Sequence, residues 1–213
     1  MNTVIDIDLI KNKVNGIEPG PIGSYWRSSV LLPLVFRDGE WQLLFEVRAE
    51  NLKTQPGEIS FPGGKMEAGE TPLECAVRET CEEIGLSRNA ITVIGELNYI
   101  ITYSNFTMYS VLGTLDPQVL EAATASADEV KELFFVPLRF FLDNEPEVFR
   151  NEVVPKIQAG FPVDKVPAGK KYPWRTGSAE VPIYTYTEPS GNERVIWGLT
   201  ARLIKDFIRV ITE

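Results

Sequence analysis

The segment from Thr71 to Gly85 constrains the fold most, because it specifies where one helix begins, where it ends and which face is buried. Thr71 can cap the helix, Pro72 suits its first turn, and Glu74 completes a capping box. Gly85 is a typical helix end. Residues that suit burial recur at helical spacing on one side: Leu73, Ala76, Val77, Thr80 and Ile84. We therefore predict a helix over Pro72–Ile84 with one face packed against another layer.

The opposite, exposed face of this predicted helix carries a cluster of carboxylates. Glu79 lies three residues before Glu82 and four before Glu83, so the three side chains share one face. Like charges at these spacings repel one another unless solvent or a cation separates them. Arg78 could hold a neighbouring carboxylate or reach back to Glu70. A solvated face of mixed charge is the alternative to a cation site.

Apolar runs on both sides of the helix predict a sheet. Ser29–Phe36 and Trp41–Val47 flank an Asp-Gly pair, which is typical of a tight β-hairpin. Further strands are expected over Ile59–Pro62, Ala90–Leu97, Thr107–Leu115, Glu132–Leu138 and both arms of a hairpin spanning Val181–Gly198. A closing helix should place these apolar residues on one side: Leu199, Leu203, Phe207 and either Val210 or Ile211. Many strands with two helices predict an α+β fold in α/β/α layers.

The chain length suits one domain, which we place at residues 28–213 after an N-terminal extension, residues 1–27. Pro, Gly and Lys without a clear period predict an irregular excursion at about 144–175. The first residues contain no long apolar run, so we predict neither a signal peptide nor a membrane span. Cys75 and Cys81 should lie on different faces of one helix, which disfavours a disulfide and favours a reducing, cytoplasmic location.

Charge and composition exclude several classes of function. The formal net charge is −9 and the pI is about 4.8, which argues against general binding to nucleic acid or to a membrane. The chain contains no histidine, which removes Ser-His and Cys-His mechanisms and histidine-rich zinc sites. Clustered carboxylates without histidine favour Mg²⁺ or Mn²⁺. A small-molecule substrate fits these limits, and a homodimer is compatible with them.

The spacing of the charged residues resembles the Nudix box, GX5EX7REUXEEXGU, where U is a bulky aliphatic residue. The matching positions are Gly64, Glu70, Arg78, Glu79, Glu82, Glu83, Gly85 and Leu86, and Thr80 departs from the pattern at a packing position. The resemblance implies an α+β Nudix fold, an α/β/α sandwich with a mixed central sheet. It also implies hydrolysis of a nucleoside diphosphate linked to another group, with Mg²⁺ or Mn²⁺ as cofactor.

The resemblance assigns roles to individual residues. It implies that Glu79, Glu82 and Glu83 bind metal together with the carbonyl oxygen of Gly64. Glu70 and Arg78 would brace the loop against the helix. Glu82 or Glu83 could take the proton of the attacking water. Some members of the family use a later glutamate instead, so three further carboxylates remain candidates: Asp128, Glu129 and Glu132.

The residues before the box resemble those of coenzyme A pyrophosphatases. Within Leu43–Gly64 the matching residues are Leu43, Leu44, Ala49, Gly57, Phe61, Pro62, Gly63 and Gly64, and Lys53 replaces an arginine. The segments Glu129–Leu138 and Ile196–Ile208 also resemble this group. The resemblance implies cleavage of coenzyme A or its derivatives to 3′,5′-ADP and 4′-phosphopantetheine or its acyl form. We name three candidate substrate contacts: Arg48, Lys53 and Gly63.

Other functions stay open at this point. The box alone is compatible with hydrolysis of ADP-ribose, NADH or nucleoside triphosphates, and with a non-catalytic nucleotide-binding scaffold. Arg48 and Lys53 could simply be surface cations. Five aromatic residues could stack on adenine or pack in the core: Tyr99, Tyr103, Phe106, Tyr172 and Trp174.

Overall fold

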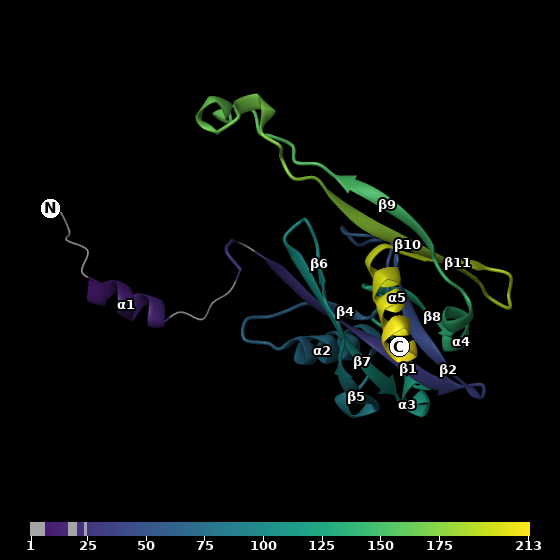
Figure 1. Ribbon diagram of the computed structural model, residues 1–213. Helices are drawn as coiled ribbons and strands as arrows, with labels where there is room; N and C mark the ends of the chain where they lie inside the picture. Colours follow the sequence, from purple (N-terminus) through teal and green to yellow (C-terminus); the bar gives the residue numbers. More distant parts are fainter. Residues whose placement is uncertain (1–6, 17–20, 24) are drawn as a thin grey trace.

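The computed structural model describes residues 7–16, 21–23 and 25–213 (Figure 1). Its helices are α1 (Ile7–Asn15), α2 (Pro72–Ile84), α3 (Pro117–Glu121), α4 (Leu138–Asp143) and α5 (Gly198–Thr212), with three short 3-10 turns, η1 (Arg88–Ala90), η2 (Val163–Lys165) and η3 (Gly169–Lys171). Within these described ranges, no helix has both the length and the apolar character needed to cross a membrane.

In the described part of the chain, eleven strands form two sheets. In chain order they are β1 (Trp26–Arg37), β2 (Glu40–Arg48), β3 (Ile59–Ser60), β4 (Gly63–Lys65), β5 (Ile91–Glu96), β6 (Ile100–Ile101), β7 (Phe106–Leu115), β8 (Val130–Pro137), β9 (Glu147–Val153), β10 (Gly177–Thr187) and β11 (Glu193–Trp197). The larger sheet has the order β3-β2-β1-β7-β5, with β4 on β1, β6 on β7 and β8 on β2. The pair β1–β7 is parallel and the other pairs are antiparallel, so the sheet is mixed as expected.

The predicted hairpin at the start of the domain is confirmed. Arg37 pairs with Glu40 in the β1–β2 register, which leaves Asp38 and Gly39 as the two turn residues. Both have positive φ, 54° and 85°. Two successive residues of this kind give a turn whose twist matches the flanking strands, which explains the Asp-Gly pair.

The large sheet is buried on both faces, which produces the predicted α/β/α layers. One hydrophobic core combines Val30, Leu32 and Leu34 with the buried side of α5. The other combines Leu31 and Val35 of the same strand with the buried side of α2. Because successive strand residues point to opposite faces, β1 supplies both cores and lies at the centre of the fold.

Helix α2 forms as the sequence predicts. Thr71 accepts a hydrogen bond from the Glu74 backbone N–H, and the Glu74 carboxylate accepts one from the Thr71 N–H, which is the capping box. Gly85 closes the helix in the left-handed region at φ 77°. A side chain at Gly85 would overlap the carbonyl oxygen of Thr124, so the glycine also permits close packing of the following loop.

Three expectations outside the central sheet are wrong in part. Helix α4 occupies the residues after β8 and was not expected. Strand β9 lies inside the segment predicted to be irregular. Val210 and Ile211 are both about half exposed, and α5 instead buries Ala201, Leu203, Ile204 and Phe207. The domain boundaries at 28 and 213 stay a prediction, and part of the predicted extension, residues 1–6, 17–20 and 24, lies outside the described residues.

The predicted C-terminal hairpin is confirmed and is part of a larger unit. β10 pairs with β11 on one side and with β9 on the other, forming a three-stranded antiparallel sheet. Figure 1 shows β9 and β10 extending away from the central layers as a long arm, with the 3-10 turns at its tip. At the base of this arm, β10, β11 and α5 pack over the central sheet through Tyr184, Ile196 and Phe207, respectively.

Candidate active site

The candidate site is built where the short strand β4 leads into the loop before α2. Gly63 and Gly64 pair with Val30 and Ser29 of β1, so the loop starts at the centre of the sheet. Gly63 has φ 153°, and a side chain there would overlap the backbone of Ser29 and Val30. Only glycine fits this close approach of two backbones.

Gly64 brings the loop against α2. A side chain at Gly64 would overlap the carboxylate of Glu79, so that carboxylate lies directly against the loop backbone. The carbonyl oxygen of Gly64 is also close to α2, since the Cys75 thiol lies 3.5 Å from it. The predicted ligands Glu79 and Gly64 are therefore neighbours in space, although 15 positions separate them in the sequence.

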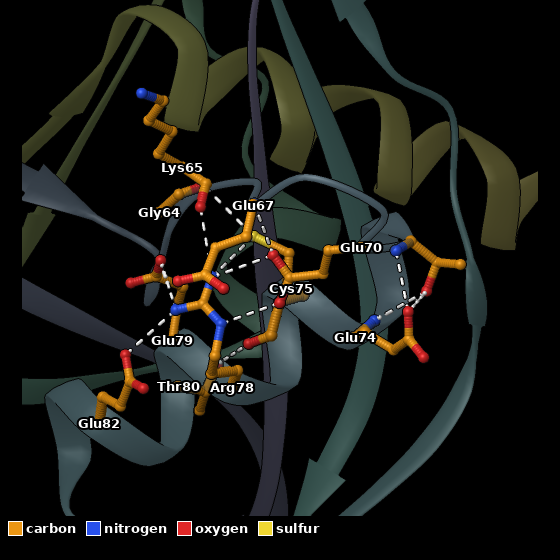
Figure 2. Close-up of polar contacts among 12 residues, drawn as sticks. Gly64, Lys65, Glu67, Glu70, Glu74, Cys75, Arg78, Glu79, Thr80 and Glu82 are labelled. Atoms are coloured by element: carbon orange, nitrogen blue, oxygen red, sulfur yellow. Dashed lines mark hydrogen bonds and ion pairs between the residues drawn. The ribbon is translucent and has the colours of Figure 1, made fainter.

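Arg78 links the loop and the helix through several carboxylates (Figure 2). Its Nε and Nη2 donate to both oxygens of Glu70, at 2.8 and 3.0 Å. Nη1 donates to Glu79 at 2.8 Å and to Glu82 at 3.1 Å, and Nη2 also reaches the carbonyl oxygen of Lys65 at 3.2 Å. Hydrogen bonds from Arg78, with one from the backbone N–H of Glu67, lower the pKa of Glu70 to about 2. Glu70 is therefore a fixed anion at neutral pH.

Glu83 departs from the expectation of an exposed carboxylate face. Its side chain is buried, and its Oε2 accepts a 2.7 Å hydrogen bond from the backbone N–H of Gly63. Its backbone carbonyl accepts another from the N–H of Ser126, in the loop before β8. Burial, followed by the nearby charge of Glu46, raises the pKa of Glu83. The helical spacing is as predicted, but the loops on either side cover this part of the face.

The other two carboxylates of the predicted cluster differ in burial: Glu79 is half-buried and Glu82 is exposed. Burial raises the pKa of Glu79, with the charge of Glu82 as a smaller cause, while Arg78 opposes the shift. The Glu82 side chain is 59% exposed. Across residues 7–16, 21–23 and 25–213, no three acidic, cysteine or histidine side chains lie close enough in this conformation to enclose an ion. Glu79, Glu82 and Glu83 still share one side of α2, as the sequence predicts.

The chemistry of these donors fits a hard divalent cation. Every group offered is a carboxylate or carbonyl oxygen, which Mg²⁺ and Mn²⁺ prefer. Two of the carboxylates, Glu79 and Glu83, are held against the backbone of the glycine loop. Burial raises the pKa of both carboxyls, although Arg78 pairs with Glu79, so added positive charge would stabilise both ionised forms. A divalent ion would supply that charge.

The three later candidates for the general base, Asp128, Glu129 and Glu132, have different surroundings. Glu129 lies near the site, since its charge contributes to the raised pKa of both Glu79 and Glu83. Glu132 instead forms an ion pair with Arg194 of β11. Asp128 is exposed, in the loop before β8.

A cavity of about 520 Å³ opens beside the glycine loop. Arg48, Gly63, Gly64 and Lys65 line it, so two of the three predicted substrate contacts lie there. The third, Lys53, is exposed and is not among the lining residues, although Thr54 and Gln55 are. The aliphatic, aromatic and sulfur-containing side chains of the wall come from five elements and the link between β3 and β4: Val30, Ile59, Phe61, Phe106, Met108, Trp197 and Leu199.

Of the five aromatic candidates for stacking, Phe106 lines this cavity. Tyr99 contacts Tyr109, and Tyr103 lines a separate groove under the arm. Tyr172 and Trp174 contact each other near the tip of the arm. The latter four therefore lie away from the glycine loop.

Several residues of the site were not anticipated. Lys65 follows the glycine pair directly, and Trp197 and Leu199 enter the wall because β11 and the start of α5 pack beside β3. Glu46 lies fully buried in β2 and approaches Glu83. Its sequence signal is a charged residue inside the apolar run Leu43–Val47, where a buried strand should carry none.

Comparisons with known proteins find a matching family model and related sequences. The family model described as NUDIX domain matches residues 26–157. A mouse protein named "Peroxisomal coenzyme A diphosphatase NUDT7" is 42% identical over 122 residues, covering 57% of this chain and 50% of that protein. "Nudix hydrolase 3" of Caenorhabditis elegans is 39% identical over 112 residues, covering 52% and 47%. The chain thus spans about half the length of the curated relatives it matches.

A solved structure supports the fold independently. The crystal structure of a MutT/nudix family protein from Enterococcus faecalis superposes with a TM-score of 0.51 at 14% identity. The match covers 98% of this chain and 71% of that one. At this identity the likeness concerns the fold.

Proposed function

Because the chain belongs to the Nudix family, we propose that it is a pyrophosphohydrolase that cleaves the pyrophosphate of coenzyme A or a coenzyme A derivative. The products would be 3′,5′-ADP and 4′-phosphopantetheine, or its acyl form. The observation that carries this substrate is the 42% identity to a relative named as a coenzyme A diphosphatase. The resemblance of Leu43–Gly64 to that group of enzymes supports it, because this segment contributes much of the cavity wall.

The proposed metal site uses Glu79, Glu82, Glu83 and the carbonyl oxygen of Gly64. Nudix hydrolases generally use divalent ions such as Mg²⁺ or Mn²⁺. Such an ion, when bound, neutralises the charge on a pyrophosphate and lowers the pKa of a coordinated water. We propose Mg²⁺ or Mn²⁺ as the ion that binds at this site.

The chain's own residues would orient and activate the reactants. Arg78 and Glu70 fix the loop that carries Gly64, so the carboxylates and the carbonyl oxygen keep their relative positions. Glu82 and Glu83 are candidates to accept the proton of the attacking water, and Glu129 is the later carboxylate whose position supports the same role.

The cavity supports a nucleotide substrate with a long organic arm. Arg48 and Lys65 supply positive charge beside Gly63 and Gly64, where phosphate oxygens would lie. The apolar wall that includes Phe106 suits an adenine ring or the pantetheine arm. Lys53 would act at the rim, on the same loop as two lining residues. A small-molecule substrate is thus proposed, with no nucleic-acid or membrane partner.

A cytoplasmic location is proposed only from the two free cysteines, Cys75 and Cys81. The mouse relative is named as peroxisomal, so the compartment has to be tested directly. Imaging of the tagged full-length protein with cytosolic and peroxisomal markers distinguishes the two locations. A peroxisomal signal would contradict the cytoplasmic proposal.

A substrate panel with product identification tests the function. The protein is incubated with coenzyme A, acetyl-coenzyme A, ADP-ribose, NADH and nucleoside triphosphates, each with Mg²⁺ or Mn²⁺, and the products are identified by mass spectrometry. Formation of 3′,5′-ADP, abolished by EDTA and restored by added metal, is the expected result. Preferred turnover of ADP-ribose, NADH or a triphosphate would replace the coenzyme A proposal with that Nudix activity. Binding without turnover in either metal would indicate a nucleotide-binding scaffold.

A further inference from the structure

Glu46 is an unusual residue for the middle of a buried strand. It lies in β2 between the buried side chains of Phe45 and Val47, and its own exposure is 0%. Ser60 Oγ donates a 2.8 Å hydrogen bond to its Oε1. The second oxygen, Oε2, is buried and meets no hydrogen-bond donor anywhere in the described part of the chain. A buried carboxylate oxygen without a partner is destabilising, so its presence requires an explanation.

Two further carboxylates, Glu83 and Glu129, lie near Glu46. The nearest cation, Arg48 Nη1, lies 3.9 Å from Oε1, the oxygen that already has a partner. The side chain of Glu83 and the charge of Glu129 both lie close enough to affect the pKa of Glu46. Burial raises the pKa of Glu46, with the charge of Glu129 as a smaller cause, while Ser60 and Arg48 oppose the shift. A cation next to Oε2 would give this oxygen the partner that it lacks.

We propose that Glu46 is a further carboxylate of the divalent-metal site, which uses its Oε2 to bind the ion held by Glu83, directly or through one water. This inference rests on the proposed metal-dependent function. It adds a residue that lies outside the box, on a strand of the central sheet. A cation beside Glu83 would satisfy the one oxygen of Glu46 that the polypeptide leaves unpartnered, while Ser60 keeps the other oxygen in place.

The test measures metal binding and does not depend on turnover. Free Mn²⁺ is followed by electron paramagnetic resonance during titration of the wild-type protein, of E46Q and of E40Q. Gln keeps the volume of Glu46 and can still accept the hydrogen bond of Ser60. We expect Mn²⁺ affinity to fall at least about 10-fold in E46Q, the lower end of the usual effect of altering groups around a metal. Glu40 is an exposed residue at the start of the same strand, so E40Q controls for the lost charge and should bind like wild type.

Each outcome decides the proposal. Equal Mn²⁺ affinity in E46Q and wild type would overturn it and leave Glu46 and Glu83 as a pair that merely shares a proton. If E46Q does not fold, as judged by circular dichroism, E46D keeps the charge but withdraws the carboxylate by one methylene. Unchanged affinity in E46D would also overturn the proposal, and weakened affinity would support it.

The same titration separates this inference from the substrate proposal. A wild-type protein that binds Mn²⁺ but leaves coenzyme A intact would refute the substrate and leave the role of Glu46 standing. Cleavage of coenzyme A together with unchanged Mn²⁺ binding by E46Q would support the substrate and refute the role of Glu46. A wild-type protein that binds no Mn²⁺ would overturn both the metal site and the part assigned to Glu46.

Discussion

Arg78 donates hydrogen bonds to both carboxylate oxygens of Glu70, from Nε at 2.8 Å and from Nη2 at 3.0 Å, and so links the glycine-loop segment to α2. The same guanidinium reaches Glu79 and Glu82. Two parallel hydrogen bonds fix orientation as well as distance, which a single lysine ammonium cannot do. The Arg78–Glu70 pair therefore sets how the loop carbonyl of Gly64 lies relative to the acidic side of the helix.

The stabilisation from Glu70 should depend on pH. The pKa of Glu70 is about 2 in the folded chain, below the ordinary value of 4.5. A carboxyl with a lowered folded pKa stabilises fully above its unfolded pKa, and this contribution disappears as pH falls through the folded pKa. We expect E70Q to lose about 1.5–3 kcal/mol at pH 7, the range for hydrogen bonds to charged groups. The difference from wild type should shrink between pH 4.5 and 2 in urea denaturation.

The contrary result for Glu70 is also specific. A difference between E70Q and wild type that stays constant from pH 7 to pH 2 would show that the ionised carboxylate is not what stabilises the loop. E67Q is the matched control, because Glu67 belongs to the same loop and exposes its side chain. Its stability should follow wild type at every pH.

E83Q should separate catalysis from folding. The Gln carbonyl can still accept the 2.7 Å hydrogen bond from Gly63, and the change removes a carboxyl whose ionised form is disfavoured by burial, so the melting temperature should stay level or rise. Gln cannot supply the negative charge that Glu83 would give to a bound metal ion, so we expect kcat to fall at least about 10²-fold. Steady-state kinetics with product detection measure this, and wild-type activity in a folded E83Q protein would refute the assignment of Glu83.

G64A should damage activity more than stability. An added methyl group would overlap the Glu79 carboxylate, which is the end of a side chain and can move aside. We expect the overpacking to lower the free energy of unfolding by about 1–3 kcal/mol. We also expect kcat/KM to fall about 10-fold or more, because the Glu79 carboxylate is displaced. G95A is the control, because a side chain at Gly95 meets nothing within 4 Å. Equal kinetics for G64A and G95A would show that the contact with Glu79 has no catalytic meaning.

The substrate contacts can be tested by their effect on KM. Arg48 lines the cavity beside the glycine loop, whereas Lys53 lies outside its wall. R48M should raise the KM for coenzyme A about 10-fold or more through the lost charge-assisted hydrogen bonds, with a smaller change in kcat. K53M should have the weaker effect of the two. An unchanged KM in R48M would remove Arg48 from the substrate site.

Local signals explain which parts of the fold could be predicted. The capping box at Thr71, the left-handed Gly85 and the Asp38-Gly39 turn are each set by neighbouring residues. Strand β9 has no such signal, because its residues are exposed on both faces except Val153 at its end, and its partner β10 follows only after the long arm. Alternation of buried and exposed residues therefore could not reveal it.

The candidate site divides in the same way. The spacing of Glu79, Glu82 and Glu83 predicts a shared face, but it cannot predict that Gly63 and the Ser126 loop cover Glu83. The effect of Glu46 on the pKa of Glu83 depends on how the tertiary structure brings β2 close to α2. Helical periodicity places charged side chains towards solvent by default, and packing of distant segments overrides that default here.

The two-sided burial of β1 limits how the chain can change in length. Inserting or deleting one residue in this strand would exchange the side chains facing α2 with those facing α5 and would shift β4 against its partner at the same time. Such frameshifts within the strand should not be tolerated. The tip of the arm, residues 154–176, lies beyond the paired residues of β9 and β10, so related chains can gain or lose segments there without disturbing either core.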